Sequence, residues 1–356
     1  MKKFTKLILA TSVAFSANAM AMQAMDDASL SETTGQDGIS IGIGISKIEI
    51  EKLFIHDNSG LAKDTTATAG VIEIYNADGE IIRPGVEAKG IVGGTGQAGA
   101  IYIKANGSGA TETNGIVIGA NYDVGPAGEE GHYLLASRNL ADLTIDSDAG
   151  DGNPFINIAA QVSGLDIHIG EIGVVASGEQ GVGSNSDTIR RGGAGNENAI
   201  LSGLSLKTGP MSANIQLGAA PQGAMIKLNS TMVGGLTINN LGILDNSTKR
   251  NLGGTTDVRK AGEIFIESIK VVDANSTDLT LNQTISVFGS ELTGDDKGYV
   301  RIVSTSGAHD NYVQGIHLGS RDATSIGDME VQGMQTYFSP APGQYAKGAV
   351  ITIRGH

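Results

Sequence analysis

The sequence predicts an all-β protein, elongated and mainly antiparallel, with sandwich-like or partly wrapped sheets and bulged strands. Three observations lead to this fold class. Glycine contributes 52 of the 356 residues and proline only seven, which indicates many tight turns. Apolar residues make up 40% of the chain, more than a disordered chain carries. They occur mostly in short β-branched runs between glycines, as strands do.

The N-terminus has the three parts of a secretory signal peptide. Three lysines stand in the first six residues, residues 7–15 form a short, mostly apolar run, and residues 17–19 are a small-residue cleavage box. A second box lies at residues 19–21. We therefore predict a signal peptide over residues 1–19 and export to the cell surface or the extracellular space, with the periplasm as the alternative.

Composition narrows the classes of partner. The formal net charge is −14, and removal of the three signal-peptide lysines makes it −17. Such a chain repels nucleic acid and anionic lipid. There is no cysteine, which excludes disulfides and cysteine-bound metals. After the signal peptide no apolar run is long enough for a transmembrane helix.

Strand periodicity begins near the mature N-terminus. The apolar residues Ile39, Ile41, Ile43 and Ile45 alternate with small residues, so they share one face of a strand. The alternation then changes parity, in a pattern of apolar-x-apolar-x-x-apolar-x-apolar. A β-bulge supplies the extra residue that such a change requires.

The bulged-strand pattern recurs along the chain. Copies start at Ile48, Ile167, Leu236, Ile264 and, more weakly, Met329. Their unequal separations favour antiparallel meanders over a regular β-solenoid, although a solenoid with large insertions remains the alternative. We expect one β-rich surface domain over residues 20–356. The polar, glycine-rich stretch at 178–198 is either a subdivision of this domain or a long hairpin connection.

No motif predicts catalysis. Residues 94–99 match a dinucleotide-type glycine pattern, but a strand follows where that site needs a helix. Residues 304–310 contain serine, histidine and aspartate, yet neighbours in sequence do not converge as a triad does. We therefore predict a protein that is not an enzyme, with no catalytic residues and no cofactor.

The best cation candidate is an acidic loop. Asp146, Asp148 and Asp151 place several oxygen donors close together, as calcium prefers. The loop departs from the calcium-binding helix–loop–helix pattern, because Asn157 stands where a bidentate glutamate belongs. Calcium is thus the one metal hypothesis, and a solvated turn is the interpretation that we favour.

A segment near the mature N-terminus is the candidate interaction site. A secreted, cysteine-free β protein can pair a strand edge with another chain, and the run from Ile39 to Ile45 is the strongest such edge, with an ordinary core strand as the alternative. The predicted interaction residues are Leu30, Gly35, Gln36, Asp37, Gly38, Ile39, Ile41, Ile43 and Ile45.

The same segment carries a family resemblance. The runs Met22-Gln23-Ala24-Met25-Asp26-Asp27, Leu30-Ser31 and Thr34-Gly35-Gln36-Asp37-Gly38-Ile39, continued by residues 41–50, resemble the mature start of FilA-like proteins of a bacterial pilus system. A related start occurs in a wider set of secreted Gram-negative proteins. The resemblance implies a surface or pilus-associated component without enzymatic activity. The chain departs from chaperone–usher pilins by lacking their common disulfide.

Three hypotheses for the function follow. The first is a non-enzymatic secreted component of a pilus-like or adhesive cell-surface assembly, with other pilus-system or surface proteins as partners. The second is a periplasmic or outer-membrane-associated scaffold for such an assembly. The third, a carbohydrate-active β-helix enzyme, would need paired acidic residues on one solenoid face, and the sequence shows no such pairing.

The export prediction has a direct test. Deleting residues 2–19 should keep the chain in the cytoplasm, because the basic start and the apolar run are both lost. Intact-mass measurement of the exported protein should place the mature N-terminus at Met20 or Met22. Export of the deletion variant at the normal level would contradict the prediction.

Overall fold

The computed structural model describes residues 38–61, 70–75, 81–88, 94–178, 197–251, 258–290 and 298–354. The described residues form an all-β structure whose strand pairs are antiparallel. The predicted fold class is therefore confirmed, and the solenoid alternative, which stacks parallel strands, is wrong. None of the helical structure in these residues is long and apolar enough to cross a membrane. It consists of the 3-10 turns η2 (Gly109–Thr111), η3 (Gly150–Gly152) and η4 (Asn246–Thr248).

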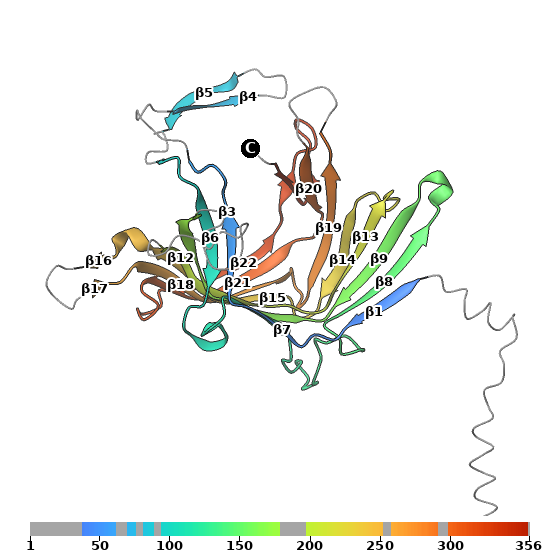
Figure 1. Cartoon of the computed structure of the whole chain (residues 1–356), viewed down its shortest axis with the longest axis horizontal. Coiled ribbons are helices and arrows are strands. Elements are labelled where there is room, and N and C mark those ends of the chain that lie inside the picture. Colours follow the sequence, from blue (N-terminus) through green and yellow to red (C-terminus); the bar gives the residue numbers. More distant parts are fainter. Residues whose placement is uncertain are drawn as a thin grey trace, which may run out of the picture.

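Two large sheets make up most of the molecule (Figure 1). Sheet A contains, in spatial order, β1 (Ile39–Ile43), β8 (Ala141–Asp148), β9 (Phe155–Val162), β13 (Met211–Gly218), β14 (Ile226–Met232), β19 (Leu279–Phe288), β20 (Tyr299–Ser304) and β25 (Ala349–Ile353).

Sheet B has one main run of strands and one branch. The main run is β2 (Lys47–Ile50), β7 (Ile116–Ala120), β10 (Leu165–Ile169), β12 (Asn198–Lys207), β15 (Leu236–Asp245), β18 (Gly262–Asp273), β21 (His309–Gly319) and β22 (Gly327–Met334). The branch is β3 (Lys52–His56), β6 (Gly99–Lys104) and β11 (Glu171–Ala176), which joins β12. Small hairpins are β4 (Gly70–Tyr75) with β5 (Ile81–Ala88), β16 (Arg250–Asn251) with β17 (Val258–Arg259), and β23 (Tyr337–Phe338) with β24 (Ala346–Lys347).

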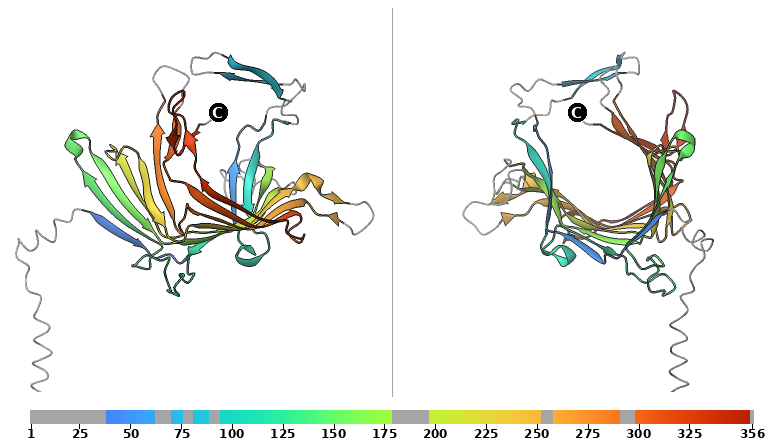
Figure 2. Two further views of the ribbon diagram at one scale, coloured as in Figure 1. Left: turned by 180° about the vertical axis from the view of Figure 1, so that it is seen from behind. Right: turned by 45° about the vertical axis from the view of Figure 1, so that its right-hand side comes forward.

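The two sheets are halves of one folded sheet. Strands of sheet A run almost directly into strands of sheet B, as where β9 passes through Ser163 and Gly164 into β10. We call the set of these short links the corner; they are residues 44–46, 163–164, 208–210, 233–235, 274–278 and 305–308. The bend at the corner gives the molecule its open, U-shaped profile (Figure 2).

The corner is built from small and polar residues. Ser163 is fully buried, and its hydroxyl donates to the Asn139 carbonyl (2.7 Å) and accepts from the Leu135 N–H (3.0 Å). The Asn121 amide donates to the Thr208 carbonyl (3.0 Å). Strands that bend away from their partners leave backbone groups unpaired, and a buried unpaired group is costly. These side chains supply the missing partners.

A second bend crosses sheet B along a line of residues with positive φ. Gly203 (φ 131°), Asn240 (φ 58°) and Gly315 (φ 66°) have left-handed or related backbone conformations at aligned positions of β12, β15 and β21. The strand register shifts on both sides of Gly203. Glycine and asparagine accept positive φ at little cost. Register shifts typical of bulges occur between β12 and β15 and between β21 and β22, whereas β15–β18 and β18–β21 pair without a shift. The bulge prediction is therefore confirmed in part. The parity changes occur along one line across the sheet, which we call the bulge line.

Both bends keep apolar residues on one face. Cross-strand registers connect them into three ladders, one on sheet A and one on each side of the bulge line in sheet B. The first is Ile39, Ile145, Ile158, Ile215, Ile226, Ile285, Ile302 and Ile351. The second is Ile48, Ile118, Ile167, Leu206, Ile238, Ile269, Val313 and Met329. The third is Leu53, Ile103, Ile172, Leu201, Ile243, Ile264 and Leu318.

The ladders line the inner side of the U. The loop of residues 121–140 lies outside the bend in every view (Figures 1 and 2). The Lys207 side chain of sheet B donates a hydrogen bond to Asp123 of this loop (2.7 Å). The side chains on the same face of the strand as Lys207 therefore point outward. Leu206 has the opposite parity and belongs to a ladder. Since side chains alternate across a strand, the apolar ladders face inward.

The closest packing lies outside the space between the sheets. Ala100, Tyr102 and Val175 form a buried cluster with Phe54 packed against it, on the face of β3, β6 and β11 opposite the third ladder. The sheets are thus splayed apart, in contrast to a closed sandwich. The predicted subdivision at 178–198 falls mostly on residues 179–196, which lie outside the described residues. The strands on either side of them, β11 and β12, pair with each other.

The corner predicts a specific intolerance to added side chains. A Cβ on Gly209 would lie 2.7 Å from the Val233 nitrogen and 2.9 Å from its carbonyl carbon. Backbone cannot move aside as a flexible side chain can, so Gly209→Ala should destabilise the protein by about 1–3 kcal/mol, measured by urea unfolding. Gly307→Ala is the matched control, because Gly307 also lies in the corner and has open space around it. Equal effects of the two changes would contradict this account.

Candidate interaction surface

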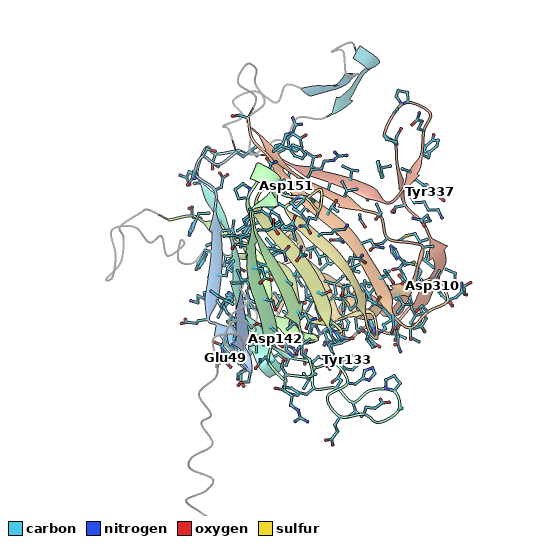
Figure 3. All side chains as sticks on the ribbon, turned by 90° about the vertical axis from the view of Figure 1, so that its right-hand side faces the viewer. Glu49, Tyr133, Asp142, Asp151, Asp310 and Tyr337 are labelled. Carbon is cyan, nitrogen blue, oxygen red and sulfur yellow. The ribbon has the colours of Figure 1, made fainter. Side chains whose placement is uncertain are left out.

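The N-terminal strands form one free margin of the folded sheet. β1 ends sheet A, β2 ends the main run of sheet B, and β3 pairs only with β6. Glu49, on β2, marks this margin in Figure 3. We call β1, β2 and β3 together the N-terminal edge. The backbone groups on its open side have no strand partner among the described residues.

Five of the nine predicted interaction residues are on or next to β1. Ile39, Ile41 and Ile43 pair with Ile145, Leu143 and Ala141 of β8. The remaining two described residues, Gly38 and Ile45, flank the strand. Ile39 is 62% exposed, Ile41 40% and Ile45 44%. The predicted residues Leu30, Gly35, Gln36 and Asp37 lie outside the described residues.

Strand β1 is held closely to the outer side chains of β8. A Cβ on Gly42 would lie 2.5 Å from the Asn139 amide nitrogen. That amide donates to Asp142 (2.7 Å), and the Ser137 hydroxyl donates to the same carboxylate. These two hydrogen bonds, Ser137 first, hold the pKa of Asp142 below its usual value. The small residues of β1 therefore allow the close approach of this anchored network.

A second free margin lies at the opposite end of the sheet. β25 ends sheet A and β22 ends the main run of sheet B; we call them the C-terminal edge. Ile351 is 54% exposed, Ile353 55% and Met329 49%. The sequence prediction of the interaction segment did not include this edge. The sequence does show alternating apolar residues at 349–353, which indicate a strand. This alternation does not show that the strand lies at an edge of the sheet.

The inner face between the edges is also accessible. Ile156, Leu217 and Val287 on sheet A are 44%, 40% and 60% exposed. Ile243 and Ile264 on sheet B are 42% and 45% exposed. Accessible apolar side chains gathered on one face make that face a candidate interaction surface.

The structure does not assemble the calcium candidates into a site. Asp146 lies within β8, and Asp148 accepts a hydrogen bond from the Gly150 N–H (2.6 Å) at the end of that strand. Asp151, at the far tip of sheet A in Figure 3, has φ 49° within η3. In the described residues no group of three or more histidine, cysteine or acidic side chains could hold a metal ion.

The serine- and histidine-containing segment at 304–310 has a structural place in the corner. The Ser306 hydroxyl accepts a hydrogen bond from the Asn282 N–H (3.2 Å). The Asp310 carboxylate accepts from the N–H groups of Asn275 (2.9 Å) and Gly333 (2.7 Å), and these bonds lower its pKa. Both side chains thus satisfy backbone groups where strands change sheets.

The outer face of sheet B carries an ion-paired cluster that the sequence did not indicate. Arg321 contacts both carboxylate oxygens of Glu263 (2.7 and 3.1 Å) and the Ser202 hydroxyl (2.7 Å). Burial alone would raise the pKa of Glu263, but the bonds from Arg321 and Ser202 outweigh it and lower that pKa. This cluster holds the loop between β21 and β22 against β18, so we assign it a structural role.

His317, beside this cluster, makes stability depend on pH. Its ring contacts the Ala323 carbonyl (2.6 Å) and Glu267 (3.1 Å), and these contacts, Ala323 first, raise its pKa. The protonated form therefore stabilises the fold below the unfolded-state pKa of about 6.5. This contribution is lost as the pH rises through the higher folded-state value.

We therefore expect the stability difference between the unchanged protein and His317→Gln to be larger at pH 5.5 than at pH 8.5. Urea unfolding at both pH values measures this stability difference. In a background that carries Glu267→Gln, the effect of His317→Gln should be smaller, because the ion pair is already weakened. A difference that grows with pH would contradict the assignment.

Comparison with known proteins gives one match. A family of unknown function, DUF6160, matches residues 1–100, which include the N-terminal edge. No curated protein and no solved structure matches the chain. Through its first hundred residues the chain is similar to DUF6160.

Proposed function

We propose that the protein is a non-enzymatic, secreted component of a pilus-like or adhesive cell-surface assembly of the FilA-like kind. The observation that carries the proposal is the free N-terminal edge, with β1 at the end of sheet A and exposed apolar side chains along it. Open strand edges attract further strands by main-chain hydrogen bonding, and natural proteins usually shield them. An edge left open at the mature N-terminus suits a protein that joins others.

Composition supports this proposal. The signal peptide predicts export, and the net charge of −14 favours solubility of a protein with an apolar inner face. An assembly without cysteine depends on backbone pairing and burial for its cohesion. The resemblance of residues 22–50 to FilA-like proteins points to the same class of function.

The accessible inner face favours a second candidate, a periplasmic or outer-membrane-associated scaffold. Exposed apolar residues on the inner face, such as Ile156, Leu217 and Val287, suit transient contact with apolar segments of other components before they assemble. A scaffold of this kind would act during assembly and then remain behind.

Fractionation of sheared cells separates the two candidates. An antibody to this chain should detect the protein in the shear-released fraction, together with extracellular filaments or sheared surface material. A resident periplasmic protein serves as the control for cell lysis. If the protein stays with the periplasmic control, the scaffold hypothesis is favoured over the surface component. Detection only in the cytoplasm would reject both hypotheses.

A further inference from the structure

We propose that the partner of the N-terminal edge is the C-terminal edge of a second copy of this chain, so that copies join head to tail. The inference deepens the proposed function by naming the partner at the edge. It rests on three properties of the two edges: which backbone groups are free, in which direction the strands run, and which side chains would meet.

The free backbone groups of β1 follow from the hydrogen bonding of β8. The Ser163 N–H donates to the Leu140 carbonyl (2.9 Å), one step beyond the pair Ala141–Val162. Hydrogen-bonded pairs recur at every second position of an antiparallel ladder, so Ala141, Leu143 and Ile145 direct their backbone groups to β1. Their β1 partners are the three isoleucines. The backbone groups of Ser40 and Gly42 remain at the open side.

The same argument applies to β25. The Thr305 N–H donates to the Asn282 carbonyl (2.8 Å), one step beyond the pair Gln283–Ser304. The even-numbered residues of β20 therefore bond β25, whose partners there are Ala349, Ile351 and Ile353. The N–H and C=O groups of Val350 and Thr352 then face the open side, where they have no strand partner among the described residues. Each edge thus offers two residues with both groups available.

The directions of the two strands are compatible. Eight strands alternate in direction across sheet A, so β1 and β25 run opposite ways. A second copy placed beside β25 with its inner face on the same side would add its β1 as an antiparallel strand. Bonding Ser40 to Thr352 and Gly42 to Val350 sets Ile41 opposite Ile351.

Side chains match in that register. The isoleucine ladder starts at Ile39 and ends at Ile351, and both ends are more than half exposed. In that register Ile351 would face Ile41 and Ile353 would face Ile39, so pairing would cover exposed apolar side chains of both margins. In sheet B, Lys47 of β2 is ion-paired with Glu49 of the same strand (2.6 Å), so the side-chain match between the edges comes from the isoleucines of sheet A.

Because the two edges are different surfaces, the contact is heterologous. Each copy that binds through one edge still presents the other, and such contacts produce closed rings or open filaments according to the rotation between copies. A filament would be the repeating body of a pilus-like assembly.

Cross-linking tests the contact, since the chain contains no cysteine. Ile41→Cys and Ile351→Cys would face each other as a non-hydrogen-bonded pair, about 4.5 Å apart at Cα, within disulfide range. Mixing the two purified mature variants under oxidation should give several-fold more disulfide-linked dimer than either variant alone. A chain carrying both changes should form a series of multimers. Ile41→Cys mixed with Thr352→Cys is the control, because those side chains lie on opposite faces.

Proline variants provide a second readout. Ser40→Pro removes an N–H from the open side of β1, where proline is tolerated at a sheet edge. It should leave thermal unfolding nearly unchanged and reduce cross-linking between Ile41→Cys and Ile351→Cys several-fold. Ile41→Pro is the contrast, because it removes an N–H bonded to β8 and should lower the unfolding temperature.

Three results would overturn the proposal. They are no selective dimer in the mixture, a dimer formed as readily by Ile41→Cys alone, and an exclusively intramolecular disulfide in the doubly substituted chain. The first and third would leave the proposed function intact if the protein is still released by shearing. Selective cross-linking of a protein found only in the cytoplasm would instead reject the proposed function and keep the head-to-tail contact.

Discussion

The structure depends on keeping apolar side chains on one face of a strand that bends twice. Side chains alternate with a period of two, so each bend would turn the following apolar residues outward unless the chain gained or lost a residue there. The link from β9 to β10 and the bulge line change the parity in this way, whereas the links from β14 to β15 and from β18 to β19 keep the parity of the ladder residues. The route from Ile158 through Ile167 to Ile172 changes parity twice and stays on the inner face. Three ladders result where a regular strand would have scattered the same residues.

The bends set the chemistry of their own residues. A bending strand parts from its neighbour, and polar side chains such as Ser163, Thr208 and Asp310 take over as partners for the backbone. Close approach of neighbouring backbones requires glycine at positions such as Gly209. The high glycine content and the serine- and histidine-containing segment at 304–310 therefore have a common explanation in the geometry of the fold.

The open shape connects stability with function. A fully buried isoleucine contributes roughly 1.5–3 kcal/mol, and ladder residues that stay partly exposed contribute a correspondingly smaller amount. Cross-strand contacts and backbone hydrogen bonds therefore contribute a larger share of the stability, and both end at the two edges. Extending the ladders into another copy would recover burial that one chain alone leaves incomplete. The same feature that limits the stability of a single chain thus favours association.

The sequence by itself determined the secondary structure class, the parity changes along the strands and the strand that forms one edge of sheet A. These are local properties: alternation, parity changes at Gly170 or Asn240, and the glycine-spaced isoleucines at 39–45 are all visible along the chain. Only the tertiary structure decided which strands neighbour each other, and hence that Ile39 and Ile351 end the same ladder. It also brought Glu263 to Arg321 and left Asp146, Asp148 and Asp151 without a shared site. Pairing between distant strands depends on the path of the whole chain, and no local pattern records it.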